Sequence, residues 1–149
     1  MINTKDVRTA INMLLNSTGI EVNSRDVEEG FKRPSFFVDI NNNKRSSSPE
    51  HVDRAMTVYI YYFPKDRYEY SLEVLDILGV LENLFDLKLK VKHRLLNIKE
   101  FDSSLTDGVL KCWFDLDFSE PREKNILDPD DIEIMQELAM HLDKKEWNE

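Results

Sequence analysis

The feature that most constrains the fold is an apolar residue at every second position from Leu110 to Phe118, with mostly polar residues between them. Successive side chains of a β-strand point to opposite faces of its sheet, so this alternation predicts a strand with one buried face. Strands are also predicted at Ser35–Ile40 and Met56–Phe63, which are rich in β-branched and aromatic residues, with a short one at Ile20–Asn23. In the predicted strand at Val109–Phe118, the buried face consists of Leu110, Cys112, Phe114, Leu116 and Phe118.

Two other segments carry apolar residues at the three- and four-residue spacing typical of one face of an α-helix. They predict helices at Thr4–Ser17, with Asn3 or Thr4 as the N-cap, and at Tyr70–Phe85. Because helices and strands alternate along the chain, the predicted fold class is α+β, with a mainly antiparallel sheet flanked by helices.

A second alternating segment, Leu87–Leu96, predicts a strand whose solvent-exposed face is basic. We interpret this face as either forming cross-strand ion pairs with Asp115 and Asp117 or contacting an acidic partner, such as the C-terminal helix of a neighbouring copy. A nucleic-acid strand is the weaker interpretation, because no aromatic residue is interleaved to stack on bases. The basic residues are Lys88, Lys90, Lys92 and Arg94.

Aromatic residues are concentrated between Tyr59 and Tyr70, where six of twelve residues are Tyr or Phe. Aromatic side chains are common both in the core of a sheet and at the centre of protein interfaces. The sequence favours core packing and leaves an aromatic interface as the alternative.

The segment Asn41–Asp53 is almost entirely polar and contains no large aliphatic or aromatic residue up to His51. Such a segment buries too little surface to offset its ordering entropy, so we expect a long mobile hairpin loop. Loops of this length are often functional. Its candidate interface residues are Asn42, Asn43, Lys44, Arg45, Glu50 and His51.

The last thirty residues hold ten acidic and four basic side chains, which gives −6 of the total net charge of −9. We predict a linker at Glu120–Leu127 followed by a helix that begins at Asp128, with Pro129 in its first position. Asp130 and Asp131 would then face the positive end of the helix dipole. The chain therefore divides into an α+β domain, 1–119, and an acidic linker and helix, 120–149.

Composition excludes several classes of protein. The single cysteine cannot form an intramolecular disulfide, and the four glycines are too dispersed for a phosphate-binding loop. None of the three histidines has a second His or a Cys at metal-ligand spacing, so no metal or other cofactor is predicted. With no apolar run near the N-terminus or elsewhere, we expect a soluble intracellular protein without a signal peptide or membrane segment.

A net charge of −9 disfavours non-specific binding to nucleic acid or anionic membranes. A distant alternative is a small acidic enzyme that uses Asp115 and Asp117, two carboxylates on one strand face, together with His93. No nucleophile, base and orienting group are visible as a set, so catalysis is not the favoured function and no catalytic residue is assigned.

Four segments in order resemble the phage tail terminator family of contractile-tailed phages and prophages. They are the run from Asn23 to Val38 with its Gly30-Phe31-Lys32-Arg33-Pro34 step, the strand Val58–Pro64, the amphipathic helix after it, and Asp107–Phe118. The resemblance spans about Met1 to Phe118 and leaves 120–149 without a matching pattern.

The resemblance implies a structural virion protein and a fold related to the tail tube subunit. Members of the family form a ring, usually a hexamer, at the head-proximal end of the tail tube, stop tube growth and provide the surface for head or neck attachment. The partners implied are further copies of the chain, the tube protein, and neck, connector or sheath proteins. DNA would pass through the channel without specific binding. The alternative is a tail-completion or head–tail joining protein.

Overall fold

A computed structural model describes residues 1–23, 33–66 and 68–122. The main sheet has five strands in the order β1-β2-β3-β7-β6, and only the β1–β2 pair is parallel. Two further strands, β4 and β5, form a separate antiparallel pair. The elements are α1 (Thr4–Asn16), β1 (Glu21–Asn23), β2 (Ser35–Ser47), β3 (His51–Phe63), α2 (Ser71–Leu84), β4 (Lys88–Val91), β5 (Arg94–Asn97), β6 (Asp102–Thr106) and β7 (Val109–Pro121).

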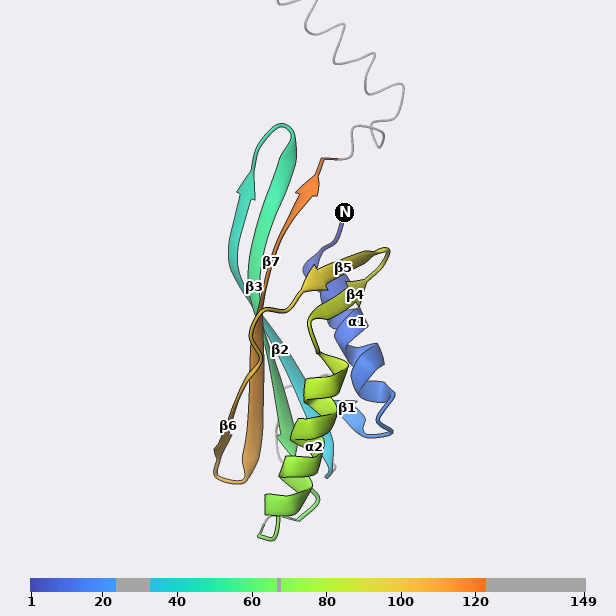
Figure 1. Cartoon of the computed structure of the whole chain (residues 1–149), viewed down its shortest axis with the longest axis vertical. Coiled ribbons are helices and arrows are strands. Elements are labelled where there is room, and N and C mark those ends of the chain that lie inside the picture. The colour runs from blue at the N-terminus through green and yellow to red at the C-terminus, as the bar shows by residue number, and fades with distance from the viewer. Residues whose placement is uncertain (24–32, 67, 123–149) are drawn as a thin grey trace, which may run out of the picture.

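The two helices and the β4–β5 pair all lie on one side of the main sheet (Figure 1). The core fills the space between them, where the predicted inward residues of β7 meet those of α1 and α2. The α+β prediction is therefore confirmed, as is the alternation along β7, where every second residue from Leu110 to Phe118 is buried. Among the described residues, no helix is long and apolar enough to cross a membrane.

Helix α1 follows directly from its local sequence. The Asn3 side chain accepts a hydrogen bond from the Asp6 backbone N–H, and the Asp6 carboxylate accepts one from the Asn3 N–H, which completes a capping box. Val7, Ile11 and Leu15 form the stripe that is fully buried against the sheet. The helix prediction is confirmed to within one residue at the C-terminal end.

The predicted loop at Asn41–Asp53 is wrong. Strands β2 and β3 continue through it as a paired hairpin arm, and only Ser48–Glu50 form the turn. The arm is stable without large apolar side chains because β3 pairs with β7 as well as with β2. The backbone groups of β3 are therefore hydrogen-bonded on both sides. The polar side chains of β2 in the arm are all exposed, so they remain in contact with water and do not oppose strand formation.

The predicted single strand at Leu87–Leu96 is also wrong, because a tight turn at Lys92 and His93 divides it into β4 and β5. Lys92 adopts a left-handed backbone conformation with a φ of 54°. Lys88 and Lys90 do project from one exposed face of β4, opposite its buried residues. Arg94 lies on the returning strand, so the four basic residues do not form one strand face.

Strand β6 was not predicted, although it forms a two-residue hairpin with β7 through Asp107 and Gly108. Both turn residues have positive φ values, 52° and 77°, as this type of hairpin turn requires. The ring of Tyr70 packs over Gly108, where an added Cβ would lie 3.2 Å from a ring carbon. The turn therefore needs glycine for both its backbone and its packing.

Strand β7 extends to Pro121, two residues beyond the predicted end of the α+β domain. Glu120, predicted to begin a polar linker, lies on the buried face of this strand and is only 7% exposed. The predicted C-terminal helix, with Asp130 and Asp131, lies outside the described residues.

Candidate assembly surfaces

The tip of the β2–β3 arm is held by hydrogen bonds rather than by packing. The Ser48 N–H donates to the His51 carbonyl over 2.8 Å, and the Ser48 hydroxyl accepts from the His51 N–H over 3.0 Å. Arg122 braces the turn from β7, since its N–H donates to the Glu50 carbonyl (2.8 Å) and its Nε to the Ser48 carbonyl (2.6 Å). Two of the predicted interface residues, Glu50 and His51, are thus exposed at a defined tip.

Lower on the arm, a β-bulge interrupts the register between Asn42 and Lys44. The Asn42 side chain accepts a hydrogen bond from Thr4 at the start of α1 (2.8 Å). Asn43 donates to the Thr57 hydroxyl (2.8 Å), which in turn donates to Asp115 (2.6 Å). Both asparagines therefore have structural contacts within the chain.

Lys44 and Arg45 remain exposed on the arm beyond the bulge. Within the described residues, the only hydrogen bond of the Arg45 side chain is to the Ser47 hydroxyl two positions away (2.9 Å). These two cations are consequently available to a partner.

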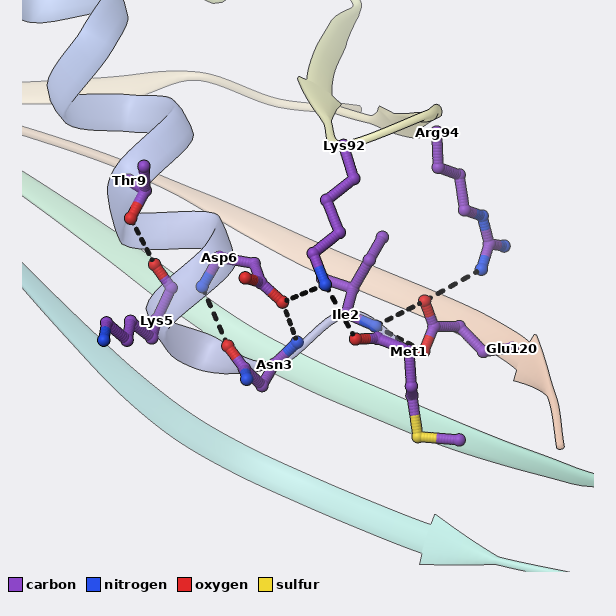
Figure 2. Close-up of polar contacts among 9 residues, drawn as sticks. All are labelled: Met1, Ile2, Asn3, Lys5, Asp6, Thr9, Lys92, Arg94 and Glu120. Atoms are coloured by element: carbon purple, nitrogen blue, oxygen red, sulfur yellow. Dashed lines mark hydrogen bonds and ion pairs between the residues drawn. The ribbon is translucent and has the colours of Figure 1, made fainter. Parts of the chain in front are cut away.

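The N-terminus is clamped to the end of β7 (Figure 2). The buried Glu120 carboxylate accepts the Ile2 N–H, which lies 3.0 Å from both of its oxygens, and Arg94 lies 3.8 Å from one of them. Lys92 reaches the Asp6 carboxylate (3.1 Å) and the Met1 carbonyl (3.3 Å) from the β4–β5 turn. Three segments far apart in the sequence are therefore joined by two carboxylates.

These contacts between the N-terminus, the β4–β5 turn and the end of β7, which we call the clamp, favour the ionised form of the Asp6 carboxylate. The Asn3 N–H bonded to its carboxylate, and then the Lys92 ammonium, lower the pKa of Asp6 below its ordinary value. Arg94 also lies over the Phe118 ring, 5.7 Å from its centroid, so its guanidinium stays in place above the end of β7.

The ion pairs predicted between the basic strand and Asp115 or Asp117 do not form. Lys92 and Arg94 instead pair with Asp6 and Glu120, and Asp115 accepts from Thr57 on the opposite face of the main sheet. The reason is topological, because β4 and β5 lie in a separate sheet on the helical side and are not neighbours of β7 in the ladder.

A groove of about 640 Å³ lies between α1 and the β4–β5 pair. Its apolar lining includes Met13 and Leu95, which are 68% and 55% exposed. The predicted basic residues of β4 and the turn, Lys88, Lys90 and Lys92, line the same groove, and Asp6 is the single carboxylate among its described lining residues.

The face of the main sheet away from the helices carries a half-buried aromatic cluster. Lys111 lies over three rings of this cluster, with its Nζ 4.8 Å from the centroid of Tyr59, 5.9 Å from that of Tyr61 and 5.6 Å from that of Trp113. Of the described elements, none covers this face (Figure 1). Part of the aromatic concentration is thus core, as with Tyr62, and part lies on an outer surface.

The residues of the enzyme alternative are not brought together. His93 lines a hollow beside Met1 and Glu120, whereas Asp115 and Asp117 line a different one next to Trp113. Cys112 is fully buried, and this burial raises the pKa of its thiol to about 12. In the part of the chain that the structure describes, no group of three His, Cys, Asp or Glu residues could hold a metal ion.

The described surfaces suit contacts with other proteins better than small-molecule chemistry. A family model described as phage tail terminator protein matches residues 6–128, well over half of the chain. The chain belongs to the phage tail terminator family. No curated protein matches the sequence.

Membership of this family makes the chain a structural protein of the phage tail, as the resemblance implied. The match includes the arm and the lysine-lined groove, and of the clamp it includes Asp6 and the residues of β5 and β7 but not residues 1–3. Sequence reasoning missed Glu120, although continuing the alternation of β7 for two more residues would have placed it on the buried face. It also missed Asp6 as the partner of Lys92, for which no local signal exists.

Proposed function

We propose that this chain forms a ring, as a hexamer, at the head-proximal end of the tail tube. The ring stops tube polymerisation and offers the surface to which the head or neck attaches. The observation that carries this proposal is the family match over residues 6–128. As a structural component, the chain has no catalytic role.

The distribution of surfaces supports a ring. A closed ring of identical subunits requires two different and complementary faces on each copy. The helical side of the chain carries the lysine-lined groove, and the opposite side carries the aromatic cluster around Lys111. One face is an apolar groove and the other an aromatic surface, so the two faces differ as a head-to-tail interface requires.

The β2–β3 arm supports a contact along the tube axis. It projects beyond the helical layer (Figure 1), and β1 pairs with β2 only as far as Phe37. The Arg8 guanidinium donates a hydrogen bond to the next carbonyl of β2, that of Val38 (3.0 Å). Beyond Val38, no described strand pairs with this outer edge of β2. A free strand edge can add to the sheet of a partner, and we assign the arm to the tube or neck protein.

The channel of such a ring must let DNA pass. The net charge of −9 makes the chain a poor ligand for phosphate, so DNA would slide through without specific binding.

The test is the length of tubes assembled from the purified tube protein of the same phage, measured by negative-stain electron microscopy. Adding the chain should shorten the length distribution and place density at one tube end. Lys44→Glu/Arg45→Glu on the arm should weaken this effect, whereas the charge-matched control Lys65→Glu/Lys99→Glu should not. Unchanged tube lengths and bare ends in the presence of excess wild-type chain would refute the proposal.

A further inference from the structure

The groove between α1 and the β4–β5 pair carries an unusual combination of features. Its lining is largely apolar and open to solvent, with Met13 and Leu95 more than half exposed. Three lysines line it as well, and within the described residues neither Lys88 nor Lys90 takes part in an ion pair. An apolar groove with cationic side chains is suited to an amphipathic segment that carries acidic side chains.

The sequence contains such a segment in residues 128–142. Five acidic residues and no Lys or Arg occur in it, and its predicted helical stripe is apolar. The stripe consists of Ile132, Met135, Leu138, Ala139 and Leu142.

The dimensions agree as well. The α1 wall of the groove runs from Asp6 to Leu14, which is about 12 Å along a helix axis at 1.5 Å per residue. A helical stripe from Ile132 to Leu142 spans about 15 Å on the same measure.

We propose that residues 128–142 of one copy bind in the lysine-lined groove of a second copy. The apolar stripe covers Met13 and Leu95, and the acidic flanks face Lys88 and Lys90. This inference rests on the proposed ring and names one of its contacts. A tail-into-groove contact is heterologous, and such a contact repeated from copy to copy closes a ring when the rotation between copies closes, as in the proposed hexamer.

The place where the chain leaves the described fold favours a second copy over the same one. Arg122 is bonded to the carbonyls of Ser48 and Glu50, so β7 ends beside the arm tip. Pro121 and Lys92 line one hollow, so β7 ends beside the Lys92 end of the groove, but the strand points away from α1 at this end (Figure 1). Only five residues, 123–127, precede the segment, and they would have to reverse direction to reach the groove of the same copy.

The experiment uses full-length chains and measures mass by light scattering. The groove variant is Lys88→Glu/Lys90→Glu, the tail variant is Met135→Asp/Leu138→Asp, and Lys65→Glu/Lys99→Glu is the charge-matched control. Circular dichroism confirms that each variant is folded. The wild type and the control should be oligomeric, and each of the two other variants alone should be monomeric.

Mixing the groove variant with the tail variant provides the decisive result. One partner still has a functional groove and the other a functional tail, so they should form a 1:1 heterodimer that cannot grow further. The heterodimer should weaken at least tenfold in affinity between low and high salt, because the contact is partly ionic.

Three results would overturn this inference. Both variants could stay oligomeric like the wild type, the mixture could remain monomeric because the tail binds its own groove, or the wild type could be monomeric at its highest soluble concentration. None of these results decides the tube-length assay, so failure of the docking contact is distinguishable from failure of the terminator function.

Discussion

Replacing Glu120 with leucine should destabilise the fold by removing the acceptor that holds the N-terminus. The Ile2 N–H is buried and has both Glu120 oxygens at 3.0 Å, so the leucine variant leaves it without a partner. A buried donor without an acceptor costs about 1–3 kcal/mol. The Arg94 pair adds less than about 1 kcal/mol, because that side chain is 40% exposed and 3.8 Å away.

We therefore expect Glu120→Leu to lower the free energy of unfolding by about 2 kcal/mol, or the Tm by about 4–8 °C for a chain of this size. Glu120→Gln keeps a carbonyl acceptor for Ile2 and should lose only about 1 kcal/mol. The matched control is Asp117→Leu, the same kind of change on the exposed face of the same strand, which should stay within about 0.5 kcal/mol of wild type.

Urea and thermal unfolding followed by circular dichroism measure these differences. Equal stability of Glu120→Leu and Asp117→Leu would refute the clamp as a source of stability. So would a ranking in which Glu120→Gln is the less stable of the two Glu120 variants.

Three further predictions concern the Asp107-Gly108 turn, the Cys112 thiol and the loss of stability at acid pH. Gly108→Ala should destabilise by about 1–2 kcal/mol in urea unfolding, because a Cβ at positive φ is strained and would also meet the Tyr70 ring. A variant as stable as wild type would contradict this packing. Cys112, whose pKa is raised to about 12 by burial, should react with a thiol reagent only as fast as the chain unfolds, and rapid labelling in native buffer would exclude it from the core. The pKa of Asp6 is lowered by Asn3 and then by Lys92, so the stability it contributes is present above the ordinary value of 3.8 and is lost as the pH falls through the lowered value. Asp6→Asn should therefore show a smaller loss of Tm between pH 7 and pH 3 than wild type, and an equal or larger loss would contradict the clamp electrostatics.

The elements that could be predicted from the sequence are those specified by local signals. Helix α1 has its capping box and stripe within thirteen residues, and β7 shows its alternation directly. Strand β6 could have been predicted too, because an Asp-Gly pair such as Asp107-Gly108 is a strong signal for a two-residue turn between two strands.

The remaining features depend on contacts between distant segments. The arm at Asn41–Asp53 has no large aliphatic or aromatic side chain up to His51, and β2 is stabilised there by ladder hydrogen bonds to β3, which itself pairs with β7. The break between β4 and β5 has no Gly, Pro or Asn to mark it, since Lys92 itself adopts the left-handed conformation. The carboxylates that pair with Lys92 and Arg94 lie 86 and 26 positions away along the chain, where no spacing rule applies.

The candidate surfaces could be predicted only in part, because they too depend on contacts between distant segments. Lys88, Lys90 and Lys92 were identified as exposed and basic, and they do line one groove. Their relation to Met13 and Leu95 required the packing of α1 against β4 and β5, which is a tertiary feature. The family resemblance, by contrast, depends on four short segments in order and is confirmed over residues 6–128.

The position of the chain in an assembled particle is the most direct measurement of its role. Cryo-electron microscopy of the phage tail should show a ring of copies at the head-proximal end of the tube, with the β2–β3 arm against the tube or neck. Density for the chain as a single copy, along the tube wall, or at the distal end would contradict the proposed role.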